Sequence, residues 1–157
     1  GLVTDAGHIT RPSVDGQAAA MRAALKSAAI DAAEIAELPA PGPGPPATAS
    51  VETAAIKAVF GARAAAIPVS ATKALHGHLL GAAGALECVL ALLSMRHSTA
   101  LPTMHLELPD PACDLDYVPN AARSGVAIRT MLSNSFAFGG TNAVLALRAA
   151  EPIRPSR

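Results

Sequence analysis

The sequence predicts one α/β domain, a sheet with helices packed against it. The 157 residues are enough for one hydrophobic core and too few for two. The chain is 51% hydrophobic and 15% charged, which excludes an intrinsically disordered protein. Stretches of helical composition alternate with short strand-like stretches and end in a strand pair, an order typical of α/β domains. We expect the domain over residues 1–150 and a disordered tail over 151–157.

Charge and hydropathy argue against two classes of partner. Twelve Lys and Arg residues balance twelve Asp and Glu residues, so the net charge is zero. Nucleic acids and anionic membranes are bound by a basic excess, so neither partner is expected. No stretch has the roughly 18 uninterrupted apolar residues of a membrane span, and no secretory signal is recognisable. The two cysteines form no disulfide framework, which favours the cytoplasm, and the absence of an initiator Met favours an excised piece.

The first half of the chain is predicted to hold two helices separated by a proline-rich segment. Residues 15–30 are rich in alanine, and Asp15 is the expected N-cap. Residues 36–46 contain five prolines and two glycines, which exclude a helix and a central strand and favour a linker. Residues 50–60 are predicted to form the second helix, which ends at Gly61.

The second half of the chain is built around one apolar helix. Residues 79–95 are apolar on every side of the predicted helix, so it must be buried on every side. A glycine-rich, polar segment over 134–142 predicts a tight, specially shaped loop. Short strands are expected over 67–72, 103–108, 115–118, 127–133 and 143–149.

The loop before the apolar helix carries Lys73, His76 and His78. A helix N-terminus disfavours imidazolium, so we expect a neutral His78 that can donate an N–H to a carbonyl or enolate oxygen. A solvated loop side chain is the alternative for this histidine. Glu87 lies within the apolar helix and needs a partner, because a lone buried carboxylate is costly. Lys73 is the nearest cation in the sequence.

The sequence gives little support for a metal site or for a nucleophilic cysteine. His76 and His78 could share one face of an extended segment and chelate zinc, but no third ligand lies at metal-binding spacing. We therefore expect no metal and no other cofactor. Cys88 is predicted to be a small core residue, and Cys113 has no base nearby in sequence, so neither is expected to be a nucleophile. The glycines at 139–140 precede a strand and not a helix, which favours a hinge or gate over a phosphate site.

Several motifs resemble those of β-ketoacyl-ACP synthases, and they occur in that family's order between residues 3 and 148. Ser70-Ala-Thr-Lys73 with Gly77-His-Leu-Leu-Gly-Ala-Ala-Gly-Ala-Leu-Glu87 resembles the second active-site motif. Asn134-Ser-Phe-Ala-Phe-Gly-Gly-Thr-Asn142 resembles the C-terminal gate motif. The resemblance implies the thiolase fold, in which two similar α/β halves each hold a five-stranded mixed sheet. This chain resembles most of the C-terminal half only. Further matching stretches are 5–16, 52–61 and 113–119.

The resemblance implies the decarboxylating condensation of acyl and malonyl thioesters carried by acyl carrier protein, in fatty-acid or polyketide synthesis. It implies that His78 polarises the malonyl thioester carbonyl and that Lys73 and Glu87 support it. Part of the acyl pocket would belong to a dimer partner. The implied substrate gate comprises Phe138, Gly139 and Gly140.

Two departures from the family pattern predict a fragment or degenerate copy that is inactive alone. The resemblance implies a nucleophilic cysteine in the N-terminal half, which this sequence does not match. Counted back from Glu52, the first family histidine falls on Pro41, and prolines also replace both threonines expected to bond the pantetheine arm. Proline has no donor, and losing one oxyanion donor typically costs about 10²–10³ in rate.

Three interpretations of the whole chain therefore stay open at this point. The first is a condensing-enzyme half whose partner is the missing N-terminal half or a full synthase subunit. The second is a non-catalytic partner subunit that resembles a chain-length factor. The third is an unrelated small-molecule binding module that uses His76 and His78.

Overall fold

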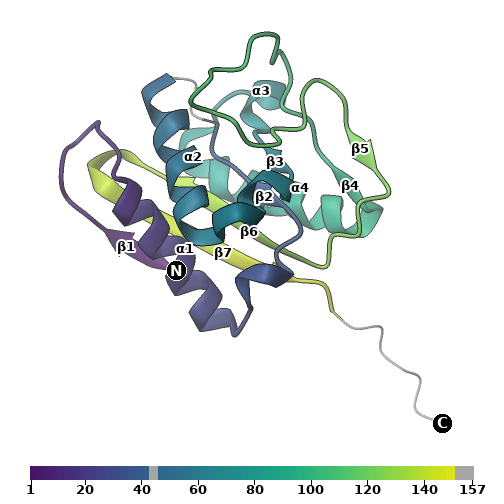
Figure 1. Cartoon of the computed structure of the whole chain (residues 1–157), viewed down its shortest axis with the longest axis horizontal. Helices are drawn as coiled ribbons and strands as arrows, with labels where there is room; N and C mark the ends of the chain where they lie inside the picture. Colours follow the sequence, from purple (N-terminus) through teal and green to yellow (C-terminus); the bar gives the residue numbers. More distant parts are fainter. Residues whose placement is uncertain (43–45, 151–157) are drawn as a thin grey trace.

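The computed structural model describes residues 1–42 and 46–150 and shows an α/β arrangement, as predicted (Figure 1). The tail expected to be disordered, 151–157, and residues 43–45 lie outside the described residues. The α-helices are α1 (Val14–Ala28), α2 (Pro46–Phe60), α3 (Lys73–His76) and α4 (Ala83–His97). Short 3-10 helices are η1 (Ala32–Glu34), η2 (Gly61–Ala66), η3 (Leu80–Ala82) and η4 (Phe138–Gly140).

A three-stranded sheet and a two-stranded sheet lie edge to edge and together form a mixed arrangement of five strands. Strands β1, β7 and β6 pair antiparallel in that order, and β2 pairs with β3 in parallel. A parallel bridge between Glu37 and Met131 joins β2 to β6 and completes the order β1-β7-β6-β2-β3. Strands β4 and β5 form a separate antiparallel pair. The strands are β1 (Leu2–Thr4), β2 (Leu38–Pro39), β3 (Val69–Ser70), β4 (Thr99–Ala100), β5 (Arg123–Ser124), β6 (Thr130–Phe136) and β7 (Thr141–Arg148).

The proline-rich segment contains a central strand, so the prediction that excluded one was wrong. The N–H groups of Leu38 and Ala40 donate to the Pro68 and Ser70 carbonyls, at 2.9 Å each. Pro39 stands between these two residues, and alternate residues of a strand direct their N–H groups toward opposite neighbours. Its missing donor therefore costs nothing on the β3 side. Toward β6, the described residues form the bridge at Glu37, with backbone hydrogen bonds from Ala36 to Thr130 and from Leu132 to Glu37.

Helices cover the two faces of the sheet unequally (Figure 1). Leu132 packs with α1 and α2 in the main core, whereas its neighbour Met131 packs with Ala91 of α4 in a smaller cluster. Adjacent strand residues point to opposite faces, so α1 and α2 lie on one face and α4 on the other.

The helix ends differ from the predictions for local reasons. Ser13, and not Asp15, caps α1, since its Oγ accepts the Gly16 N–H at 3.2 Å. Asp15 lies in the first turn, where a carboxylate interacts favourably with the helix dipole. Helix α2 begins at Pro46, four residues earlier than expected at Ser50, and proline is tolerated in a first helical turn.

Several predicted strands are shorter or absent. In the described residues, the stretches 103–108 and 115–118 form loops, linked by a single bridge between Thr103 and Pro119. Strand β6 runs to Phe136, so most of the predicted loop over 134–142 is strand, and the tight turn is confined to residues 137–140.

Helix α4 is not buried on every side, which corrects the sequence prediction. Its buried positions carry small or polar residues, whereas Val89, Leu92 and Leu93 are 52%, 51% and 42% exposed. By length and composition alone the stretch 80–97 could cross a membrane, and 22% of it is buried. Within the described structure, α4 packs on β6 through one face only.

Candidate functional site

A buried ion pair joins Lys73 to Glu87, as the sequence predicted. Lys73 begins α3, Glu87 lies in the second turn of α4, and the two side chains are 9% and 3% exposed. The other ion pairs among residues 1–42 and 46–150 lie at the surface. Each charge here compensates the other, because a single buried charge would be several kcal/mol less favourable than a pair.

Glu52 and Asn134 extend this cluster, and sequence reasoning gave neither of them a role. Glu52 of α2 is buried and accepts a hydrogen bond from Asn134 Nδ2 of β6 at 3.3 Å. Burial raises the pKa of Glu52 to about 8, although the Asn134 hydrogen bond and the charge of Lys73 both oppose the rise. The signal for Glu52 was present: a carboxylate beside an apolar helical stripe, the same signal that identified Glu87.

His78 lies outside this cluster, on the surface of the chain. Within the described residues its one hydrogen bond is from the Leu80 N–H to Nδ1, at 3.0 Å. Nδ1 accepts in this bond, so Nε2 is the ring nitrogen that remains available to a ligand. His76 instead bonds Thr72 Oγ1 at 3.3 Å. Across the described ranges, no group of three or more His, Cys, Asp or Glu residues is arranged to hold a metal ion.

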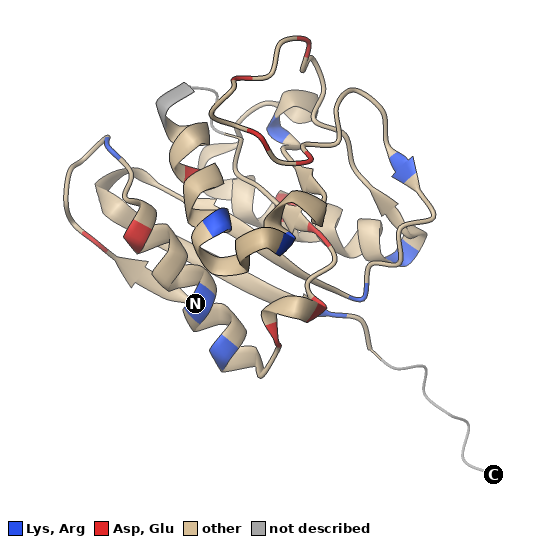
Figure 2. Ribbon diagram, in the orientation of Figure 1, with Lys and Arg blue, Asp and Glu red and all other residues tan. Residues whose placement is uncertain are grey.

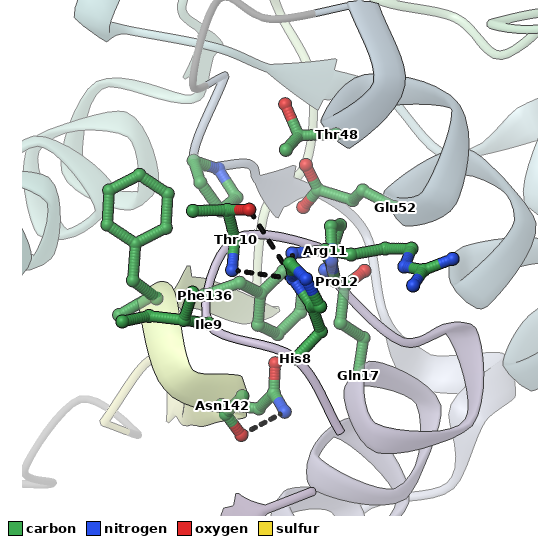
Figure 3. A pocket seen from close by; sticks show the side chains of 14 residues that line it. His8, Ile9, Thr10, Arg11, Pro12, Gln17, Thr48, Glu52, Phe136 and Asn142 are labelled. Carbon is green, nitrogen blue, oxygen red and sulfur yellow. Dashed lines mark hydrogen bonds between the residues drawn. The ribbon is translucent and has the colours of Figure 1, made fainter. Parts of the chain in front are cut away.

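A small cavity brings Pro41 together with the gate motif. Figure 3 shows Gln17, Glu52 and Asn142 among the residues around it. Its volume is about 60 Å³, enough for a few water molecules or one small chemical group. Pro41 and Glu52 line it, and so does Phe138, which lies in the turn over residues 137–140, called here the gate turn. Gln17 of α1 also lines it, and the Oε1 of this buried side chain has no hydrogen-bond partner in the described structure. Pro41, where the resemblance implies the first family histidine, therefore shares this cavity with residues of the predicted gate.

The gate turn is fastened to the loop that follows β1. The Asp5 N–H donates to the Gly140 carbonyl at 3.0 Å, and the Gly139 N–H donates to the Ile9 carbonyl at 2.8 Å. Asn142 Nδ2 donates to Asp5 Oδ2 at 3.0 Å. Phe138 at the tip of the turn remains 75% exposed. Hydrogen bonds thus hold the backbone of the turn in place, whereas the aromatic side chain at its tip is exposed to solvent.

Gly140→Ala is expected to destabilise the chain by about 2–3 kcal/mol. Gly140 has a φ of +73°, and a Cβ there would collide with the Asp5 carboxylate and lie 2.8 Å from the Ala6 nitrogen. Gly139→Ala is the matched control, since Gly139 has a φ of +75° but open space around it. Its expected cost is about 1 kcal/mol. Urea unfolding measures both, and equal losses would contradict the proposed clash.

The sequence from residue 3 to residue 107 matches the family model described as "Beta-ketoacyl synthase, C-terminal domain". The chain belongs to the β-ketoacyl synthase family. Its match with curated family members covers nearly all of its own length and little more than a third of theirs. The chain is 47% identical to 3-oxoacyl-[acyl-carrier-protein] synthase 2 of Coxiella burnetii over 149 residues, which are 94% of this chain and 36% of the relative. It is 45% identical to nodulation protein E of Rhizobium meliloti over 94% of this chain and 37% of that protein.

Solved β-ketoacyl synthase structures share the fold. A β-ketoacyl synthase from Burkholderia phymatum STM815 superposes with a TM-score of 0.90 at 38% identity, over 96% of this chain and 36% of the other. The structure described as "The ishigamide ketosynthase/chain length factor" gives a TM-score of 0.91 at 40% identity, over 96% and 37%. The chain therefore corresponds to a C-terminal half with the thiolase-like architecture.

The residues predicted for this β-ketoacyl synthase half separate into two groups in the structure. Lys73 and Glu87 are in contact, and Pro41 shares a cavity with Phe138 and Gly140. His78 has no hydrogen bond to either group among the described residues. Both cysteines are free and half-buried, so the prediction of a core position for Cys88 was only partly right.

Proposed function

We propose that this chain is the C-terminal half of a condensing enzyme and is inactive on its own. The parent activity is the decarboxylating condensation of acyl and malonyl thioesters of acyl carrier protein. In this assignment His78 donates Nε2–H to the malonyl thioester carbonyl, and the Lys73–Glu87 pair supports the loop that carries it. Phe138, Gly139 and Gly140 form the gate between the acyl and malonyl sites. A structure of a type II polyketide ketosynthase with its acyl carrier protein, 36% identical to this chain, is consistent with such a partner.

The observation that carries this proposal is the position of Pro41. It lines the cavity beneath the gate, where the resemblance implies the first of two histidines. A proline there can neither donate a hydrogen bond nor take up a proton, so one donor to the thioester oxygen is missing. The chain also spans little more than a third of its relatives, and the resemblance puts the nucleophilic cysteine in the remainder.

The first test is a condensation assay with acyl- and malonyl-carrier thioesters. The isolated chain is expected to form no product above background. Combined with a cysteine-bearing N-terminal half, Pro41→His is expected to raise turnover by about 10²–10³, the usual effect of one oxyanion donor. His78→Ala should lower the residual rate by a similar factor, and Ala58→Phe on the outer side of α2 is the control. Turnover by the isolated chain would overturn the proposal.

A non-catalytic partner subunit is the second candidate, and α4 favours it. Val89, Leu92 and Leu93 form an exposed apolar row, called here the α4 face, and contiguous apolar surface usually marks an interface. Two similar solved structures are described as ketosynthases with chain length factors. The α4 face would pack against the missing half or against a complete synthase. Figure 2 shows acidic and basic residues interspersed over the described chain.

Binding through the α4 face can be tested by co-purification. The full chain is expected to co-purify with a separate N-terminal half or a complete synthase when the two are co-expressed in the cytoplasm. Leu92→Glu should abolish this association, because it would bury a charge in an apolar interface. Leu108→Glu, at an exposed leucine outside α4, should have no effect. A monodisperse monomer that binds neither partner counts against this candidate.

A further inference from the structure

A second and larger cavity, of about 390 Å³, lies on the other side of the segment that carries Pro41. Ala40 and Gly42 line it, whereas Pro41 lines the first cavity, because successive residues of an extended segment point in opposite directions. Glu52 lines both cavities, so this residue lies between them. The volume is in the range of small-molecule sites.

The inner wall of this cavity is made of residues with little or no side chain. Ala40, Ala49, Ala71 and Ala74 come from the β2, α2 and β3–α3 segments. Gly42 closes this wall, since a Cβ on it would lie 2.6 Å from the Ala71 Cβ. The cavity therefore exists because the residues of this wall have small side chains, which leave a space between the packed elements.

The outer wall is the loop over residues 103–117, which is held in place by hydrogen bonds. The Leu106 N–H donates to Asn120 Oδ1 at 3.0 Å, and Asn120 Nδ2 donates to the Leu106 carbonyl at 2.8 Å. Leu108 lines the cavity but is 91% exposed, an unfavourable position for a large apolar side chain in water. An occupant of the cavity would give Leu108 an apolar surface to cover.

The polar groups at the cavity define the chemistry of an occupant. Tyr117 already bonds its hydroxyl to Thr53 Oγ1 at 2.6 Å. Glu52 is buried at the cavity wall, and burial favours its uncharged acid, which donates one hydrogen bond. His105 and Asp110 also line the cavity, but both are exposed residues of the outer wall, and Thr103 Oγ1 already accepts the Ala71 N–H at 3.0 Å. At the buried inner wall, apolar residues and one neutral donor disfavour a charged ligand, because its charge would be buried without a partner.

We propose that the second cavity binds a compact, uncharged apolar molecule with one hydrogen-bonding head group. The apolar part lies between Ala74 and Leu108, and the head group meets Glu52. The site depends on the geometry of this chain and is independent of the condensation activity proposed above. A short aliphatic amide is the simplest probe with these properties.

Cys113 lies in the cavity lining and reports on its occupancy. In the full chain with Cys88→Ser, Cys113 is the one thiol, and its alkylation by iodoacetamide is followed by mass spectrometry. Octanamide is expected to slow this alkylation at least fivefold. Octanesulfonate, an anion with the same chain length, should give less than a twofold effect. Unchanged alkylation up to the solubility limit of octanamide would overturn the proposal.

A variant whose cavity is filled by a larger side chain shows whether octanamide protects Cys113 by binding in the cavity or by binding elsewhere on the protein. Ala74→Phe places a ring in the space from an exposed position, so the protection by octanamide should disappear. Ala58→Phe, on the exposed side of α2 and outside the cavity, should retain it. If circular dichroism shows that Ala74→Phe is unfolded, Ala49→Leu fills the same space from α2. Protection that persists in a folded, filled variant places the probe elsewhere and rejects the site.

Discussion

Lys73→Met is expected to lower the free energy of unfolding by about 3–5 kcal/mol at pH 7, the typical cost of breaking a buried ion pair by removing one partner. The substitution keeps the apolar stem of the side chain but leaves Glu87 charged and 3% exposed. It also removes the positive charge that favours ionisation of the neighbouring Glu52. Urea denaturation followed by circular dichroism measures the loss.

Two comparisons test whether burial causes this effect. Lys57→Met breaks the pair with Asp114, in which the two side chains are 44% and 57% exposed, and is expected to cost far less, because water screens exposed ion pairs. Adding Glu87→Leu to Lys73→Met removes the uncompensated charge and should restore most of the stability. If Lys73→Met and Lys57→Met have equal costs, the pair does not behave as a buried one.

Stability is expected to fall as the pH rises from about 5 to about 8. Burial raises the pKa of Glu37 to about 7 and that of Glu52 to about 8, both from an ordinary value of 4.5. Between the unfolded and folded values, the folded chain holds a proton that the unfolded chain has lost, so each increase in pH favours unfolding. The loss is complete once both groups have ionised in the folded chain. For Glu37 alone it is on the order of 3 kcal/mol.

Glu37→Gln is the variant that tests this pH dependence. Glu37 accepts a hydrogen bond from Ser70 Oγ at 2.7 Å, and its Oε2 is buried without a partner in the described chain. Glutamine cannot ionise, so the slope of stability against pH should decrease, and the double variant with Glu52→Gln should be nearly flat. Glu107→Gln, at an exposed position, should leave the slope unchanged. A flat wild-type curve from pH 5 to 8 would refute the expectation.

The parts of the fold that sequence predicted well are those set by local rules. The pairing of Lys73 with Glu87 followed from the cost of a lone carboxylate in an apolar helix. The α/β order followed from the alternation of helical and strand-like stretches, and the gate turn from consecutive glycines. The resemblance of motifs identified the family before any geometry was considered, and the comparisons confirm it.

The predictions that failed concern neighbours that a local pattern does not reveal. Pro39 was excluded from a central strand because a proline lacks one donor, but the rule does not say which neighbour would have used it. The large residues of α4 were expected to be buried because they are apolar, yet the small ones face the sheet. The burial of Glu52 could have been predicted from the apolar stripe beside it, but its neighbours could not, because Asn134, Lys73 and Glu87 come from other parts of the chain.

The single bridge at Glu37 has a mechanical consequence. Hydrogen bonds are continuous across β1, β7 and β6 and across β2 and β3, but sparse between these two groups. Thermal opening should therefore start along this line, because local unfolding begins where the fewest interactions must be broken. Glu37, which loses its proton near neutral pH, lies at this same junction. Alkaline pH and heat should therefore both weaken the contact between β2 and β6.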